Sequence, residues 1–195
     1  MAAWESFLDE FFRRPGRAGP DLSVLDALTE PEREQAVDLL LAAAGKGDVR
    51  AIQGLAHLRA ARAVGPLRSL MRGHRGLVRV YAAAALWWLD RDAQALATLC
   101  REAVHRPWLR RSAPHRAHAA AILSQIDHDA ARRALAQVIH DPEYEVRYHA
   151  YEGLAVVLGR SREIWNYVCK PDIHHHVRGR IDQRLRRAGL LPDRA

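Results

Sequence analysis

Residues 78–89 read VRVYAAAALWWL, and residues 141–157 read DPEYEVRYHAYEGLAVV. In both stretches an arginine is followed by small or apolar residues three, six, seven and ten positions later. These offsets place the side chains on one stripe of an α-helix, and alanine or glycine at the third and sixth positions lets a neighbouring helix approach closely. Each stretch therefore predicts an amphipathic helix that packs tightly against a similar one.

The same pattern recurs along the chain. Its anchor residues are Asp48, Arg79, Arg116, Arg147 and Arg178. The spacings between them are 31, 37, 31 and 31 residues. A single six-residue insertion near residues 107–112 explains the one spacing of 37 residues. A second apolar helix follows in each complete unit, over residues 61–72, 93–105, 130–140 and 162–170. A helix pair of this kind cannot bury its apolar stripe alone, so the pairs must stack on one another.

The motifs Val78-Arg79-x-x-Ala82-x-x-Ala85-Leu86 and Asp141-Pro142-x-x-x-Val146-Arg147-x-x-Ala150 resemble the short bacterial HEAT-like repeats, a class first described in phycobilisome lyases. The resemblance covers about residues 48–188 and implies an all-α, right-handed α-solenoid of about four to five two-helix repeats. It says little about activity, because the scaffold serves adaptors, inhibitors, lyases and DNA-repair enzymes.

The resemblance also implies roles for positions within the repeat. In the family, the anchor arginine commonly pairs with an acidic residue in an adjacent turn, and Asp90, Asp127 and Asp141 stand at suitable places. The second helix of each pair lines the concave face of such arrays. We therefore expect a structural role for the anchor arginines and look for the binding surface on the second helices.

The domain prediction has three parts. Residues 1–47 form N-terminal capping helices, residues 48–176 form the repeats, and residues 177–195 form a basic C-terminal capping helix and tail. Caps are expected because the end repeats would otherwise expose apolar surface. The apolar stripes predicted to cover the two ends are Trp4, Phe7, Leu8, Phe11 and Phe12 at the front, and Val177, Ile181, Leu185 and Ala188 at the back.

Charge is distributed unevenly along the chain. Residues 1–47 carry five basic and nine acidic side chains, whereas residues 48–195 carry 25 basic and 14 acidic, a net charge of +11. Such a body should attract an acidic protein surface, nucleic acid or an anionic membrane, and charge balance alone does not choose among them. The polar positions of the second helices are the candidates for partner binding: Arg68, Arg72, Arg101, His105, Arg132, Arg133, Gln137, His140, Asn166 and Lys170.

Trp87 is a candidate aromatic anchor. With Ala82, Ala85 and Leu86 facing inward, Trp88 falls at the edge of the stripe while Trp87 points away from it. An outward tryptophan is either covered by the inserted segment that contains Pro107 and Trp108 or contacts a partner directly.

Signatures of catalysis are absent from the sequence: it contains no glycine-rich phosphate loop, nucleophile elbow or zinc-protease helix motif. The run Asp172-Ile-His-His-His176 lacks further ligands at metal-site spacing, so we predict no metal site and no cofactor. Cys100 and Cys169 both fall within helical patterns, so we predict no disulfide. The sequence has no leader or spanning segment, which favours a cytoplasmic protein. The type of repeat favours a bacterial source. We expect a monomer.

The sequence thus predicts a non-catalytic scaffold, adaptor or inhibitor, for example of the toxin-immunity type, that binds an acidic protein or peptide through a basic concave surface. The alternative is a nucleic-acid-binding protein related to the HEAT-like alkylpurine DNA glycosylases, which would also be the main enzymatic possibility. The same basic face and the arginine-rich helix near the C-terminus would serve that function.

Overall fold

A computed structural model describes residues 2–13, 19–105 and 113–192. The expectation of an all-helical fold is confirmed, since these residues form helices, turns and loops and contain no strand. Within them, no helix has the length and apolar character needed to cross a membrane. The chain divides into two compact units, Met1–Ala95 and Leu96–Ala195.

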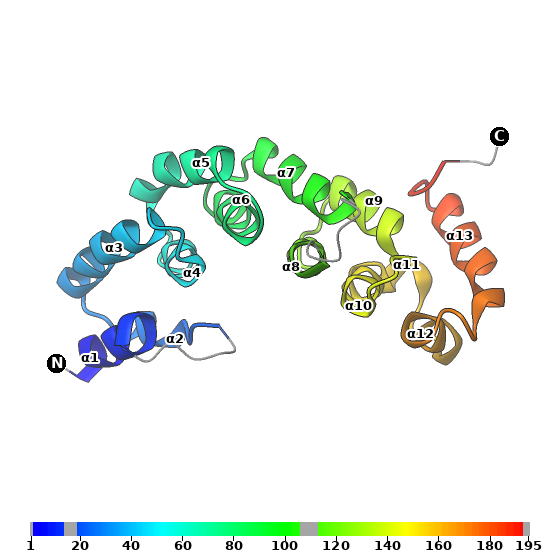
Figure 1. Cartoon of the computed structure of the whole chain (residues 1–195), viewed down its shortest axis with the longest axis horizontal. Helices are drawn as coiled ribbons and strands as arrows, with labels where there is room; N and C mark the ends of the chain where they lie inside the picture. Colours follow the sequence, from blue (N-terminus) through cyan, green and yellow to red (C-terminus); the bar gives the residue numbers. More distant parts are fainter. Residues whose placement is uncertain (1, 14–18, 106–112, 193–195) are drawn as a thin grey trace. The chain divides into compact units, whose positions relative to one another are not determined.

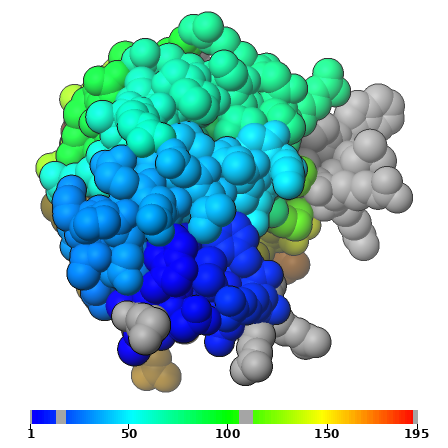
Figure 2. Space-filling model, turned by 90° about the vertical axis from the view of Figure 1, so that its left-hand side faces the viewer, coloured from blue at the N-terminus to red at the C-terminus, as the bar shows by residue number. Residues whose placement is uncertain are grey.

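The first unit contains six complete helices among its described residues and the start of a seventh (Figure 1). They are α1 (Ala2–Leu8), α2 (Ser23–Asp26), α3 (Glu30–Ala44), α4 (Val49–His57), α5 (Val64–Gly73), α6 (Leu77–Asp90) and the beginning of α7 (Ala93–Val104). Helix α3 packs against α4, α5 packs against α6, and α4 and α6 lie side by side. On the side seen in Figure 2, the blue N-terminal residues and the cyan to green residues that follow form one continuous surface.

Local sequence signals explain where the helices of this unit begin. Before α3, Thr29 and Glu32 form a reciprocal capping box in which the Glu32 carboxylate accepts the Thr29 backbone N–H at 2.9 Å. Before α4, the carboxylate of Asp48 accepts the backbone N–H groups of Arg50 and Ala51. The acidic residue that replaces arginine at the first repeat anchor is therefore a helix cap.

The N-terminal aromatic stripe is buried only in part. Phe7 and Phe11 are buried, whereas Phe12 is 40% exposed. The helix widens into a π-helical turn over Asp9–Arg13, which changes the angular spacing of successive side chains. The Phe12 ring still packs with the stripe, since its centre lies 5.6 Å from that of Phe7 and 6.4 Å from that of Phe11.

The second unit repeats the packing of the first. Its described helices are the end of α7, α8 (Ala113–Leu123), α9 (Asp129–Val138), α10 (Tyr144–Gly153), α11 (Ala155–Leu158), α12 (Arg162–Cys169) and α13 (Arg178–Arg187). Helix α8 packs against α10, and α9 packs against both. The side chains of Leu123, Leu135 and Leu154 are fully buried in this core.

The last helix departs from the repeat. The residues after anchor Arg178 were predicted to form a capping helix, and in the structure α13 packs against α11 while α12 packs against α10. Arg184 occupies a position that is small or apolar in the other repeats, where a small side chain permits close helix contact. Its guanidinium instead donates to the backbone carbonyl of Leu158 at the end of α11.

The apolar face predicted for the C-terminal helix is largely correct. Val177, Ile181 and Leu185 are buried, and only Ala188, just beyond the end of α13, is exposed. Burying three aliphatic side chains of this kind contributes roughly 1.5–3 kcal/mol each. The helix is therefore an integral part of the second unit.

Candidate functional site

Two of the predicted binding arginines are held by aspartates of the protein itself. In the first unit, Arg68 on α5 contacts Asp90 at 2.7 Å and Asp92 at 3.1 Å. In the second unit, Arg132 on α9 forms ion pairs with Asp127 and Asp129. Each arginine is thus neutralised by two carboxylates, so neither offers a full positive charge to a partner.

His140 connects three segments of the second unit. It follows α9, and its Nδ1 contacts the Tyr167 hydroxyl of α12 at 2.5 Å while its Nε2 contacts the Asp182 carboxylate of α13 at 2.8 Å. The side chains of His140 and Asp182 are only 13% and 14% exposed. Burial also raises the pKa of the Tyr167 hydroxyl, which stays protonated. This geometry gives His140 a role in holding α13 in place.

The other predicted binding residues keep more of their polar surface. Arg72 donates to the Gln94 side chain at 3.5 Å, Arg101 to the Thr98 hydroxyl at 3.3 Å, and Arg133 to the Asp129 backbone carbonyl at 3.4 Å. These acceptors are neutral, so no carboxylate of residues 2–13, 19–105 and 113–192 pairs with the three guanidinium groups. Of the rest, His105, Gln137 and Lys170 are exposed and Asn166 is half-buried.

Two anchor arginines are structural. Arg116 forms an ion pair with Asp141 at 3.0 Å, with the two side chains 7% and 0% exposed. Arg147 donates to the backbone carbonyls of Asp141, Pro142 and Val168. The expected pairing with an acidic residue in an adjacent turn is confirmed for Arg116.

The other two acidic residues suggested for this role have different partners. Asp90 pairs with Arg68 and Asp127 with Arg132, neither of which is an anchor arginine. Anchor Arg79 donates through Nε to the backbone carbonyl of His74, and Arg178 is exposed. The structural use of the anchor arginine therefore varies between repeats.

The two tryptophans differ in exposure. Trp87 is 8% exposed, so it is largely covered within the protein, whereas Trp88 is 41% exposed. The guanidinium of Arg91 lies 5.2 Å from the Trp87 ring centre and 5.4 Å from that of Trp88, within cation–π range of both. The segment with Pro107 and Trp108, which was expected to cover Trp87, lies outside the described residues.

The helix α13 carries the largest group of uncompensated cations in the described part of the second unit. Arg178 and Arg187 are exposed and contact no carboxylate of the described residues, while Arg184 and Arg186 donate to the backbone carbonyls of Leu158 and Pro192. Among the described residues, Arg180 pairs with Glu163. The other four arginines of this short helix therefore have no carboxylate partner within the part of the chain that the structure describes.

An exposed aromatic cluster, which the sequence analysis did not single out, lies on α10 and α12. Tyr144 is 44% exposed and lies 6.1 Å from Tyr148, whose ring lies 6.0 Å from that of Trp165, itself 37% exposed. Tyrosines four residues apart on a predicted helix were a signal for the first pair. The contact with Trp165 depends on how α10 and α12 pack, which the repeat pattern did not specify.

Two groups of the second unit have shifted pKa values. Burial lowers the pKa of His149 on α10, and the nearby His118 adds to this effect, while Glu145 and Glu152 oppose it. Burial raises the pKa of the Cys100 thiol, which therefore stays protonated and poorly nucleophilic. In the described part of the chain, no three His, Cys, Asp or Glu side chains are grouped as metal ligands.

Comparison with known proteins gave no match to a family model, to a curated protein or to a solved structure.

Proposed function

We propose that the chain is a HEAT-like right-handed α-solenoid that acts without catalysis, as a scaffold, adaptor or inhibitor that binds an acidic protein. Support for the repeat architecture comes from each unit taken by itself, because α4 packs on α6 in one and α8 on α10 in the other. The anchor residues Arg116 and Arg147 have the buried, structural roles that such repeats give them.

The observation that carries the binding proposal is the uncompensated charge on α13. The second unit contains 17 basic and 11 acidic side chains, a net charge of +6, whereas the first contains 13 and 12, a net charge of +1. Guanidinium groups dock carboxylates with two parallel hydrogen bonds, and those of Arg178 and Arg187 need not break an ion pair to do so. An acidic protein surface fits this helix better than it fits Arg68 or Arg132.

The test compares two double variants in which the same amount of charge is removed. Arg178→Gln with Arg187→Gln removes two exposed cations without carboxylate partners, and Arg62→Gln with Arg68→Gln removes two that are already paired with carboxylates. Fluorescence anisotropy with a labelled polyglutamate peptide should show weakened binding for the first variant and little change for the second. An equal loss in both would mean that net charge alone attracts the peptide, and α13 would not be the binding surface.

A second candidate function, nucleic-acid binding, is favoured by the aromatic cluster of Tyr144, Tyr148 and Trp165. Exposed aromatic rings suit a single strand, whose bases stack on rings while its phosphates contact arginine. A labelled single-stranded DNA and a labelled duplex, each titrated at two salt concentrations, separate the two functions. Binding of DNA that is tighter than that of polyglutamate, and that is lost with Trp165→Ala, would favour nucleic acid over an acidic protein.

A further inference from the structure

Three histidines form a cluster between α12 and α13, at the first turn of the arginine-rich helix (Figure 1). They are His174, His175 and His176, which lie in and just before the short 3-10 helix η4 (His175–Val177). The ring centres of His174 and His175 each lie 6.1 Å from that of His176. Because η4 packs against both α12 and α13, the cluster lies directly against the helix that we propose as the binding surface.

Both neighbouring helices supply a charged side chain to this cluster. Nε2 of His176 lies 3.8 Å from the carboxylate of Glu163 on α12, and the same carboxylate forms an ion pair with Arg180 of α13. The side chains of His176 and Arg180 are both more than half exposed. A proton gained by His176 is therefore not fully matched by Glu163, which already has a cationic partner.

The loop before η4 leaves one nitrogen of His175 able to bind a proton. The backbone N–H of His174 donates to the carbonyl of Lys170 at 3.2 Å, and Nδ1 of His175 lies 3.3 Å from the backbone carbonyl of Asp172. Since a carbonyl oxygen only accepts hydrogen bonds, Nδ1 carries the hydrogen in this contact. Nε2 of the same ring remains to accept a further proton.

The permanent charges of this region nearly cancel. They are three cations and two anions, namely Lys170, Arg178, Arg180, Asp172 and Glu163, with a net charge of +1. Protonation of the three histidines raises the net charge to +4. Histidine changes its charge between about pH 8 and pH 5, so this increase falls within a mild range of pH.

The added charge lies close enough to act on an anion bound at Arg178. Two peptide units separate this arginine from His176, so their Cα atoms lie within about 7.6 Å of each other. Charges closer than roughly 8–10 Å are not fully screened at physiological ionic strength. A carboxylate docked on Arg178 would therefore interact with the protonated cluster as well.

From this arrangement we propose that protonation of His174, His175 and His176 strengthens the binding of an acidic partner at α13. Near pH 8 the partner meets the arginines alone, and near pH 6 it meets additional cations at the first turn of the same helix. An acidic partner favours the protonated form of each histidine, so its affinity rises as the pH falls. The inference rests on the proposed function, because it specifies how the same surface is regulated.

The experiment measures the affinity of a fluorescently labelled oligoaspartate peptide for the whole protein at pH 8 and at pH 6, at constant ionic strength. Aspartate is a suitable probe because its carboxyl group titrates near pH ~3.9 and stays ionised at both values. The peptide should bind roughly tenfold more tightly at pH 6, since each of three exposed charge pairs contributes a factor of about two.

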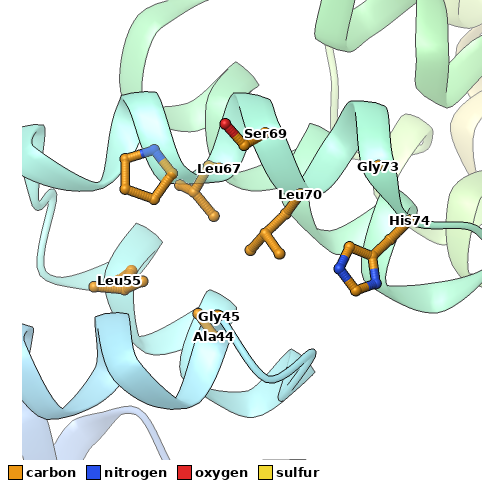
Figure 3. A pocket seen from close by; sticks show the side chains of 9 residues that line it. Ala44, Gly45, Leu55, Leu67, Ser69, Leu70, Gly73 and His74 are labelled. Carbon is orange, nitrogen blue, oxygen red and sulfur yellow. The ribbon is translucent and has the colours of Figure 1, made fainter.

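Two matched double variants locate the effect. His175→Gln with His176→Gln removes the two exposed histidines of the cluster and should reduce the ratio of affinities to about twofold. His57→Gln with His74→Gln removes both histidines of the first unit, which does not contain α13, and should leave the ratio unchanged. His57 contacts the exposed Asp26, and His74 stands at the edge of a small apolar pocket beside α5 (Figure 3).

A third variant makes the charge permanent. His175→Arg with His176→Arg places two cations at exposed positions, where a longer polar side chain can extend into solvent. This variant should bind the peptide at pH 8 nearly as tightly as the unsubstituted protein does at pH 6. Its affinity should also change little between the two pH values.

The outcomes separate this regulation from the proposed function. Equal affinity of the unsubstituted protein at pH 8 and pH 6 would overturn the role of the histidines while an acidic partner remains supported. A ratio that His175→Gln with His176→Gln leaves unchanged, or that the first-unit variant lowers equally, would have the same meaning. Absence of peptide binding at either pH would overturn the regulation and the proposed function together.

Discussion

One arginine–aspartate pair in each unit makes an instructive comparison, because the two pairs lie at different depths. In the first unit, Arg68 and its partner Asp90 are 40% and 49% exposed, and His57 contacts Asp26 at a site where the aspartate is 68% exposed. In the second unit, Arg116 and Asp141 are almost fully buried. Sequence alone describes both as Arg–Asp pairs, yet their energetic roles differ, because a buried charge is destabilising once it loses its partner and an exposed one is not.

The repeat position six residues after the anchor shows the same contrast. It is Gly54 in the first unit and Gly153 in the second. A Cβ atom at Gly54 would lie 3.0 Å from the ends of the Leu40 and Phe11 side chains, whereas one at Gly153 would lie 2.9 Å from the Cα of Ser124. Side-chain ends move more easily than backbone, so the second unit should tolerate change less well.

The largest difference should come from the arginine–aspartate pairs. Asp141→Ala leaves the Arg116 charge buried without its partner and should destabilise the protein by about 3–5 kcal/mol. Asp90→Ala removes one of two exposed partners of Arg68 and should cost at most about 1 kcal/mol. Urea unfolding followed by circular dichroism measures both values, and similar losses would contradict the contrast in burial.

The second-largest difference in stability should come from the two histidine–aspartate pairs. Asp182→Ala leaves the partly buried His140 without its acceptor on α13 and should cost about 1–3 kcal/mol. Asp26→Ala breaks the exposed contact with His57 and should change stability by less than about 1 kcal/mol. The melting temperatures of the two variants provide the comparison, and a larger loss for Asp26→Ala would argue against the role of His140 in anchoring α13.

Replacing Gly54 and Gly153 with alanine should change the free energy of unfolding by smaller amounts that still differ between the two positions. Gly153→Ala forces α8 and α10 apart and should destabilise by about 1–3 kcal/mol after the gain in helix propensity is subtracted. Gly54→Ala should be near neutral, because Leu40 and Phe11 can shift and alanine favours the helix by up to about 1 kcal/mol. Equal free energies of unfolding for the two variants would show that the backbone contact at Ser124 relaxes easily.

The smallest effect should appear as a pH dependence of the second unit. The folded pKa of His149 lies below its unfolded value, so the unfolded chain binds a proton first as the solution is acidified. The associated stability is complete above the unfolded pKa of about 6.5 and is lost as pH falls through that value toward the folded pKa. His149→Gln should flatten stability between about pH 7 and pH 5, as followed by thermal melts at several pH values. If the melting temperature of His149→Gln fell with decreasing pH as steeply as that of the unsubstituted protein, other groups would be responsible for the acid sensitivity.

The sequence was informative where periodicity determines structure. The anchors and their apolar followers predicted buried positions such as Ala82, Leu86, Ala150 and Leu154, all of which lie in the core. Such positions are predictable because burial of one helix stripe follows directly from residue spacing.

The candidate site was less predictable, because it depends on which charges meet in space. Arg68 and Arg72 stand one turn apart on α5 and look equivalent in the sequence, but only Arg68 lies within reach of Asp90 and Asp92. The difference in exposure between Trp87 and Trp88 has the same origin, because tertiary packing selects among faces that local spacing leaves similar.

The attachment of α13 through His140 also bears on the order of events during synthesis. The helix α13 leaves the ribosome after the segments that contain Leu158 and His140, which Arg184 and Asp182 of this helix contact. Until it docks, the surface that buries Ile181 and Leu185 stays open to solvent and to chaperones. The first unit, Met1–Ala95, has by then been synthesised in full. The nascent chain therefore passes through a stage in which the N-terminal unit is complete and the C-terminal unit still depends on its last helix.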